Sequence, residues 1–296
     1  MVIEPKLPEK VKYLETFSFP LVKKLCRKTR GEAFVGGRPG YDKEVLFFWL
    51  LMKKVTNWSY ETVASMAGVS HPTLIRANRL FLEKGIYQKV FVDLIKRAYR
   101  EGLIKGKYVA MDSSFVRTFS GKEELGSEGW NGFKEAFGFK LHLLIDCETK
   151  FPLALCITNG NAADNTLAIP LLKKARVWLK NAGYVVADKG YDDSDIVDWI
   201  VKALKAKAGI PIKKVNRGKN YTWEGSWRNF QEKAKGRSLK KSIYNRRTSI
   251  ERVFSVLKRV YYLGKEESRG ILNFAKQVYL SLICYILKLF YIAKTN

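Results

Sequence analysis

The hydrophobic pattern of the chain changes near residue 104. Before this point apolar residues recur at helical spacing, in the segment that begins at Asp42 and again over residues 81–104. After it, short continuous apolar runs alternate with segments of helical periodicity, and such runs are typical of buried strands. We therefore predict a helical region over residues 1–104 and an α/β domain over residues 105–296.

The order of the apolar runs predicts a mixed sheet. Strands are expected at 107–111, 140–146, 152–158, 184–187 and 209–213, with helices at 166–180, 193–206 and 246–262. A short link joins the second and third strands as a hairpin. Three antiparallel strands followed by alternating units match a ribonuclease-H-like fold, a mixed sheet flanked by helices. An irregular, basic insertion at about 214–243 and an apolar C-terminal helix at 272–293 complete the predicted domain.

Residues 59–80 have the pattern of a helix-turn-helix. Ser59 is placed to cap a first helix, Gly68 can take the left-handed turn conformation, and Ser70 is placed to cap a second helix. That second helix carries Arg76 and Arg79, and a helix-turn-helix places its second helix in the DNA major groove. An ordinary helical hairpin would follow the same sequence logic.

The charge balance indicates a polyanionic partner. Lys+Arg number 54 and Asp+Glu 28, so the formal net charge is +26. Self-repulsion of this size is costly unless a polyanion neutralises it, and the cations are spread over the chain, as expected for a folded basic surface. Nucleic acid is the favoured partner, and a generic lysine-rich composition is the alternative.

Cysteine, histidine and hydropathy patterns exclude several other classes. The four cysteines are scattered and there are only two histidines, so a zinc site or a secreted disulfide framework is not expected. The N-terminus lacks a signal-peptide core, and the apolar stretch from Val278 to Ala293 is short for a bilayer span and contains Lys288. We expect a buried C-terminal helix in a cytoplasmic, nucleoid-associated protein without membrane contact.

Three acidic residues stand out by their positions. Asp112 and Asp188 each end a short apolar run, and Glu251 lies on a later predicted helix. A carboxylate at the end of a buried strand has lost water and needs a partner, most often a metal ion. Three carboxylates match the oxygen ligands that Mg²⁺ prefers, so this pattern points to phosphoryl-transfer chemistry on nucleic acid.

The helix that carries Glu251 has a narrow polar face. At about 100° per residue, Tyr244, Arg247 and Lys258 each lie within about 40° of Glu251 around the helix axis. This face borders the apolar face, so Glu251 is expected at the rim of the core. Arg247 and Lys258 could hold phosphates there while Glu251 binds metal. A simple exposed Arg247–Glu251 pair, worth roughly a few tenths of a kcal/mol, is the alternative.

These residues resemble a known family. The spacing Tyr-x2-Arg-x3-Glu-x6-Lys over residues 244–258 is similar to the signature of insertion-sequence DDE transposases. The segments around Asp112 and Asp188 resemble the first and second acid motifs of that group, and the similarity covers roughly residues 40–290. The gap from Asp188 to Glu251 favours the family named for insertion sequence five, because it is too short for the β-rich insertion of some relatives. One departure is Ala163, where many relatives carry a histidine.

The resemblance implies a DNA transposase. Asp112, Asp188 and Glu251 would be catalytic and would hold two Mg²⁺ ions, with Mn²⁺ accepted by the same oxygen ligands. Tyr244, Arg247 and Lys258 would contact the DNA strand that is cut. Arg76 and Arg79 would read the element's ends, and a homodimer would synapse the two ends.

Accessory roles are open for four further residues. Tyr191 fits either packing or the site, and His142 fits a hydrogen-bonded sheet histidine better than a catalytic group. Trp223 and Trp227 could stack on unpaired bases near the cut or pack within the insertion. Asp146 fits a turn-forming role.

Three rival functions use the same residues differently. A ribonuclease-H-like nuclease or resolvase would cut without joining. A domesticated, non-catalytic DNA-binding regulator would keep the fold, although the presence of all three acids argues against decay. A basic structural or membrane-surface protein would explain the charge but not the placement of the acids.

Overall fold

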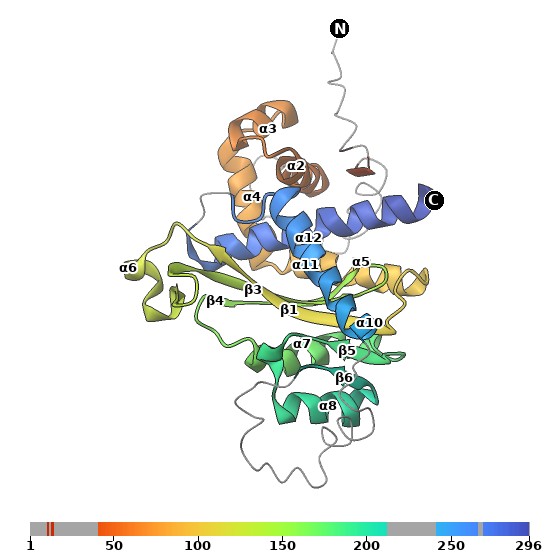
Figure 1. The fold of residues 1–296 in the computed structure, drawn as a ribbon. Coiled ribbons are helices and arrows are strands. Elements are labelled where there is room, and N and C mark those ends of the chain that lie inside the picture. Colours follow the sequence, from red (N-terminus) through yellow and green to blue (C-terminus); the bar gives the residue numbers. More distant parts are fainter. Residues whose placement is uncertain (1–10, 12, 15–40, 212–240, 266–268, 296) are drawn as a thin grey trace. The chain divides into compact units, whose positions relative to one another are not determined.

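The computed structural model describes residues 11, 13–14, 41–211, 241–265 and 269–295 (Figure 1). The chain divides into two compact units, each described here by itself. The first comprises Met1–Arg97, Val256–Glu266 and Leu272–Asn296, and the second Ala98–Ser255 and Glu267–Ile271. The last helix thus groups with the N-terminal helices, while the functional boundary at residue 104 stays a prediction.

The first unit is helical where it is described. Its helices are α2 (Lys43–Thr56), α3 (Tyr60–Ala67), α4 (His71–Glu83), most of α5 (Ile86–Arg100) and α12 (Gly270–Thr295). Phe47, Phe81 and Tyr87 form an aromatic cluster with ring centroids 5.5 to 6.0 Å apart. Burial of such rings is a main source of stability in a small helical core.

Helices α3 and α4 are the two helices joined by a tight turn that the sequence predicts, and their role as a DNA-binding helix-turn-helix stays a prediction. The backbone N–H of Thr62 donates to the Ser59 hydroxyl, and Gly68 ends α3 in the left-handed conformation with φ 66°. Ser70 precedes α4 as predicted, but its hydroxyl contacts the Thr73 hydroxyl at 2.9 Å and makes no capping bond to the backbone. The turn therefore depends on the Ser59 cap and on Gly68.

Helix α12 is the only described helix long and apolar enough to cross a membrane by length and composition. Its most apolar window is 56% buried, and Val278, Leu282 and Ile286 are fully buried. This matches the prediction of a buried C-terminal helix.

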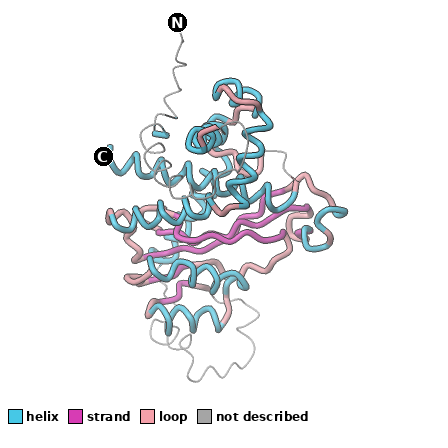
Figure 2. The backbone as a smooth tube through the Cα atoms, turned by 180° about the vertical axis from the view of Figure 1, so that it is seen from behind, coloured by secondary structure: helices cyan, strands magenta, loops and turns pink. Residues whose placement is uncertain are grey.

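The second unit contains the sheet (Figure 2). Its strands are β1 (Tyr108–Arg117), β2 (Trp130–Asn131), β3 (Ala136–Asp146), β4 (Pro152–Asn159), β5 (Tyr184–Val186) and β6 (Lys207–Gly209). β3 pairs antiparallel with β1, β2 and β4, while β1, β5 and β6 run parallel. Antiparallel strands followed by parallel ones confirm the ribonuclease-H-like α/β fold that the sequence predicts.

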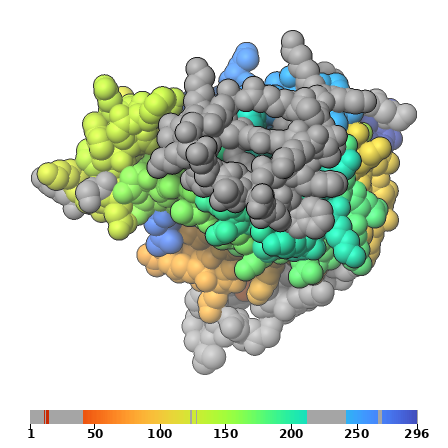
Figure 3. All heavy atoms as spheres, turned by 60° about the horizontal axis from the view of Figure 1, so that its bottom comes forward, coloured from red at the N-terminus to blue at the C-terminus, as the bar shows by residue number. Residues whose placement is uncertain are grey.

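Short helices flank this sheet. They are α6 (Lys122–Leu125), the 3₁₀ turns η2 (Ser127–Gly129), η3 (Asn165–Leu167), η4 (Arg176–Trp178) and η5 (Lys189–Tyr191), α7 (Ala168–Ala175) and α8 (Ser194–Leu204). α7 packs against β3 and β4, and α8 against β6. Figure 3 shows the side of the molecule with α7 and α8 among its green to teal spheres.

The signature segment begins with α10 (Lys241–Tyr244) and η7 (Asn245–Arg247) and continues as α11 (Thr248–Arg259). The prediction of one regular helix from residue 246 to 262 is therefore corrected at both ends. The structure interrupts it with a 3₁₀ turn before Thr248 and ends it at Arg259. The helix predicted at 166–180 is likewise split into η3, α7 and η4.

Two strand predictions need correction. The first strand does not end at Asp112, because β3 supplies an antiparallel partner as far as Arg117. Asp112 therefore lies in the middle of β1. The last strand starts at Lys207, earlier than predicted, because the left-handed Lys205 ends α8 and lets Ala208 and Gly209 pair with β5.

Candidate active site

Asp112 and Asp188 lie side by side because two parallel strands are in register. Ala110 of β1 pairs with Val186, the last residue of β5. Asp112 follows two residues later within β1, and Asp188 follows two residues later in extended backbone just past β5. Since alternate residues of a strand face the same way, both carboxylates belong to the same face of the sheet. The sheet register therefore positions two of the three predicted acids.

Each aspartate is held by the backbone that follows it. The N–H of Ser113 donates to Asp112 Oδ1 at 2.8 Å, and the N–H of Gly190 donates to Asp188 Oδ1 at 2.7 Å. A Cβ at residue 190 would lie 2.8 Å from Asp188 Oδ1, so glycine is required for this close turn. The second acid is thereby fixed as the cap of η5.

Burial gives Asp112 an unusual affinity for protons. Its side chain is 18% exposed, and burial, together with the negative charge of Asp188, raises its pKa to about 6. The hydrogen bond from Ser113 and the charge of Arg247 oppose this shift. A nearby cation therefore stabilises the ionised form of the Asp112 carboxylate strongly.

Arg247 connects the sheet to the third acid. Its Nη2 lies 2.5 Å from Glu251 Oε1, and its Nη1 lies 3.5 Å from Asp112 Oδ2. Burial lowers the pKa of Arg247, but Glu251, Tyr244 and Asp112 outweigh burial and raise it. The i,i+4 pair expected for an isolated helix does form, and the same guanidinium also reaches Asp112, 135 residues away in sequence.

The donor set fits a divalent metal in its chemistry. No three described His, Cys, Asp or Glu residues are arranged as a ready metal cluster. Asp112 and Glu251 instead share the positive charge of Arg247, where a cation would compensate the same two carboxylates. Carboxylate oxygens are the ligands of Mg²⁺ and Mn²⁺, so Asp112, Asp188 and Glu251 could hold metal once Arg247 withdraws.

The other two signature residues lie on the same helical segment. The Tyr244 ring centroid is 5.8 Å from the Arg247 guanidinium carbon, and Tyr244 is half-buried. Lys258 lies about two turns after Glu251 on α11 and is also half-buried. The structure thus keeps all four signature side chains on one helical segment, while their roles stay predictions.

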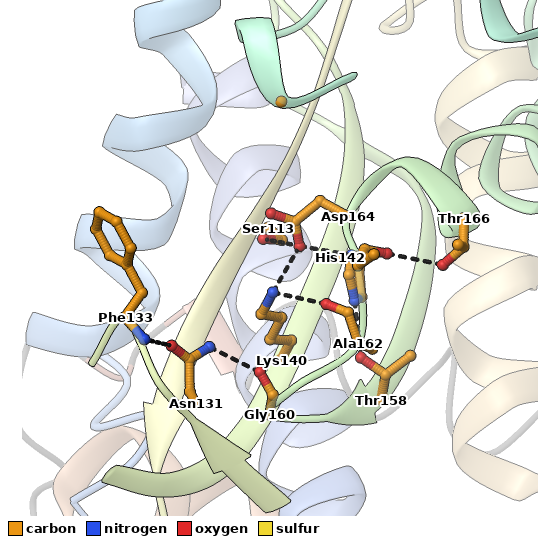
Figure 4. A network of polar contacts seen from close by, with 12 residues as sticks. Ser113, Asn131, Phe133, Lys140, His142, Thr158, Gly160, Ala162, Asp164 and Thr166 are labelled. Carbon is orange, nitrogen blue, oxygen red and sulfur yellow. Dashed lines mark hydrogen bonds and ion pairs between the residues drawn. The ribbon is translucent and has the colours of Figure 1, made fainter. Parts of the chain in front are cut away.

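A polar network missed by the sequence analysis includes Ser113, the residue after Asp112 (Figure 4). The Ser113 hydroxyl donates to Asp164 Oδ1 at 2.8 Å, and Lys140 Nζ lies 3.0 Å from the same oxygen. Lys140 Nζ also donates to the carbonyl of Ala162 at 2.7 Å. This network ties the loop after β4 to β1. The sequence feature that could have indicated this network is Lys140, a charged residue at the start of an apolar run that predicts a strand.

His142 and Asp146 have structural contacts. His142 is fully buried, its Nε2 lies 2.8 Å from the Thr158 hydroxyl, and burial lowers its pKa to about 4. Asp146 is also fully buried and accepts hydrogen bonds from the N–H groups of Lys105, Gly106 and Glu148. These contacts support the interpretations of a packed sheet histidine and a turn-forming aspartate.

Tyr191 is fully buried close to the acids. Burial raises the pKa of its hydroxyl well above the usual value, and the charges of Asp112, Asp164 and Asp188 add to this effect. The hydroxyl has no hydrogen-bond partner among the described residues. Tyr191 is therefore a buried neighbour of these three aspartates with no hydrogen bond to them in the described part of the chain.

The remaining predicted residues lie elsewhere. Arg76 and Arg79 are exposed on α4, and Arg79 pairs with Glu83 at 3.4 Å. Trp223, Trp227 and most of the predicted insertion lie outside the described residues.

Comparison with known proteins gives the family. Residues 105–287 match the transposase DDE domain family, which is more than half of the chain. The chain therefore belongs to this family, and the protein is a DNA transposase, a metal-dependent enzyme that cuts DNA. No curated protein matches the chain.

One solved structure supports the fold, and a second is a weaker match. A piggyBac transposase synaptic complex with hairpin DNA is similar with a TM-score of 0.51 and 12% identity, over 97% of this chain and 73% of that one. A Mos1 mariner paired-end complex with Mn has a TM-score of 0.25 and 9% identity, over 90% of this chain and 84% of that one.

Proposed function

We propose that the protein mobilises an insertion sequence of the insertion-sequence-five type, by binding the element's ends, cutting there and joining the freed end to target DNA. The carrying observation is the placement of Asp112 on β1 and of Asp188 just after the paired parallel strand β5, with Glu251 linked to Asp112 through Arg247. The Tyr-x2-Arg-x3-Glu-x6-Lys spacing over residues 244–258 supports the subgroup.

Asp112, Asp188 and Glu251 are the proposed ligands of two Mg²⁺ ions, and Mn²⁺ would bind the same oxygens. When bound, such ions would activate the attacking water or 3′-hydroxyl and stabilise the leaving 3′ oxygen. The residues of the chain contribute by holding the metal-binding carboxylates in position. The Ser113 and Gly190 N–H groups hold two of the carboxylates, so that little reorganisation is needed during the reaction.

Arg247 has two proposed partners. In this structure its guanidinium neutralises Asp112 and Glu251. Once these two carboxylates bind metal ions, the Arg247 guanidinium can bind a phosphate of the cut strand. A planar guanidinium suits this role because it donates two parallel hydrogen bonds to a phosphate. Tyr244 and Lys258 would contact the same strand.

Residues 1–104 are the proposed end-binding region and residues 105–296 the catalytic domain. Arg76 and Arg79 on α4 are exposed and available to base edges or phosphates. Because an element has two ends, we propose that two copies act together as a homodimer. The chromosomal substrate would place the protein in the cytoplasm, on the nucleoid.

One assay separates this function from its rivals. Purified protein is incubated with Mg²⁺ and DNA carrying the native element end and its flank, and a precleaved 3′-OH end with target DNA is tested in parallel. We expect cleavage and joining by wild type, neither by Asp188→Ala, and wild-type levels for the exposed control Asp198→Ala.

Other results would replace the proposal. Cleavage without joining would indicate a nuclease or resolvase. End binding without cleavage by any variant would indicate a regulator. Equal cleavage by wild type and Asp188→Ala would refute the assigned site.

A further inference from the structure

A row of aromatic and basic residues crosses the starts of the three parallel strands. Tyr108 of β1 pairs in register with Tyr184 of β5, which pairs with Lys207 of β6. The two tyrosine rings are stacked, with centroids 5.4 Å apart and planes 9° from parallel. Strands β1 and β5 thus present two nearly parallel aromatic rings next to each other.

Cations surround these rings. The guanidinium carbon of Arg246 lies 4.0 Å from the Tyr108 ring centroid. Lys207 Nζ lies 5.7 Å from the Tyr184 centroid, and Lys107 Nζ lies 5.6 Å from the Tyr108 centroid. We call Lys107, Tyr108, Tyr184, Lys207 and Arg246 the aromatic–cation row. Both lysines are exposed, and the other three members are half-buried.

The neighbouring acids leave the row with a net positive charge. Glu148 lies 3.7 Å from Arg246 and offsets part of that charge. The nearby Asp146 is fully buried and is occupied by backbone N–H groups. The two exposed lysines therefore set the electrostatic character of this surface.

The three members of the row that lie on strands, Tyr108, Tyr184 and Lys207, are on the same face of the sheet as Asp112. Tyr108 and Asp112 are four residues apart on β1, and Asp188, in extended backbone just after β5, comes four residues after Tyr184. Even spacing keeps side chains on one face, and four residues of strand span about 13 Å. This distance corresponds to roughly four base-pair steps of duplex DNA at 3.4 Å each.

We propose that the aromatic–cation row binds phosphates of the duplex outside the element, about four base pairs from the cut, in the flanking DNA. This inference rests on the proposed function. The flank differs from one insertion to the next, so contacts to it must be independent of sequence. The two exposed lysines of the row can neutralise phosphates, and phosphate contacts carry no sequence information. Arg246 is already stacked on Tyr108 and paired with Glu148.

The first test measures binding to a duplex that spans the element end and its flank, in EDTA so that no cleavage occurs. The variant Lys107→Glu/Lys207→Glu is compared with Lys122→Glu/Lys173→Glu, two exposed lysines of α6 and α7 with the same change in net charge. We expect the row variant to bind roughly tenfold more weakly than the control. The slope of its log K against log salt concentration should also be shallower by about 0.9 for each phosphate contact that is lost. Equal binding by the two variants would overturn the proposal.

The second test locates the contact. Single uncharged methylphosphonates replace phosphates at about four base pairs from the cut, on the flank side or on the element side. On the flank side we expect weaker binding by the control variant and no further loss by the row variant. The same pattern on the element side would show that the row binds the element end, contrary to the proposal.

Failure of the proposed function would look different. Binding in EDTA does not require catalysis, so a wild-type protein that never cuts or joins DNA could still show a flank-side contact. In that case the row would stand as a DNA-binding surface and the transposition mechanism would fall. Circular dichroism of each variant confirms that the fold is retained.

Discussion

The Arg247 guanidinium lies 3.5 Å from the Asp112 carboxylate, although 135 residues separate the two along the chain. The same guanidinium holds Glu251, so one cation neutralises two of the three proposed metal ligands. Metal and Arg247 therefore compete for the same oxygens. This competition has a measurable consequence.

Replacing Arg247 by alanine should tighten metal binding by the DNA-free protein. The two carboxylates lose their internal partner, and a positive charge that repels the metal is removed. We expect a several-fold lower Kd for Mn²⁺ in calorimetry, on the order of 1 kcal/mol. Arg252→Ala, an exposed position on the same helix, should leave the Kd unchanged. An unchanged or higher Kd for Arg247→Ala would show that this arginine does not compete with metal.

Asp112→Asn should stabilise the metal-free protein at high pH while abolishing cleavage. The native pKa of about 6 exceeds the ordinary value of 3.8, so ionising Asp112 costs stability above about pH 6 and costs nothing below about pH 4. Denaturant unfolding in EDTA should show a gain of about 1–3 kcal/mol at pH 8 and little change at pH 4. A gain of equal size at both pH values would contradict this explanation. Metal binding by wild type should weaken as pH falls through about 6.

The Lys140–Asp164 pair should be energetically coupled. Lys140→Met leaves Asp164 without its cation, and Asp164→Leu leaves a nearly buried amine, so each should cost about 1–2 kcal/mol. The double variant should lose clearly less than the sum, as unfolding free energies in a double-mutant cycle would show. The exposed Lys202–Asp198 pair is the control, with an expected coupling below about 0.5 kcal/mol. Additive losses at Lys140 and Asp164 would rule out a direct role for the pair.

Tyr191→Phe should be neutral or stabilising. The Tyr191 hydroxyl is buried without a described partner, so its removal relieves a desolvation cost. Tyr87→Phe is the matched control, because the Tyr87 hydroxyl is equally buried but donates to Asn78 Oδ1 at 2.8 Å. We expect Tyr87→Phe to lose about 1 kcal/mol and Tyr191→Phe to lose nothing, with cleavage retained. Loss of cleavage in a stable Tyr191→Phe protein would assign the hydroxyl a role in the reaction.

Arg76→Ala should reduce binding to the element end more than binding to unrelated DNA. Arg76 is exposed on the second helix of the helix-turn-helix, where base-edge contacts would provide about 1–3 kcal/mol of discrimination. Lys89→Ala, an exposed position on α5, serves as the comparison in anisotropy titrations at fixed salt. Equal losses on both DNAs would assign Arg76 to phosphate contact only.

The sequence predicted best those features that depend on local chemistry. Ser59 and Gly68 mark the helix-turn-helix by capping and by left-handed backbone, and both act as expected. The parallel pairing that aligns Asp112 with Asp188 follows from strand order. The length of β1 was not predictable from its own sequence, because Ser113 and Ser114 resemble the end of a strand. Pairing with β3, which comes later in the sequence, keeps them in the sheet.

Contacts between distant segments were harder to predict. Sequence spacing placed Arg247 near Glu251, but nothing local indicated that Arg247 also reaches Asp112. The Lys140–Asp164 pair was missed for the same reason, since its partners come from β3 and from the loop after β4. Long-range electrostatic partners depend on the final packing, which hydrophobic periodicity does not specify.

The pairing of Ala110 with Val186 also determines which substitutions can abolish the activity of the enzyme. Main-chain hydrogen bonding between β1 and β5 sets the spacing of the two aspartates, and slipping by one residue would turn one carboxylate to the opposite face. Interior changes at Val109 or Val185, both fully buried, could therefore silence the enzyme while every acidic side chain remains in place. An inactive copy of this protein need not have lost any residue that touches DNA or metal.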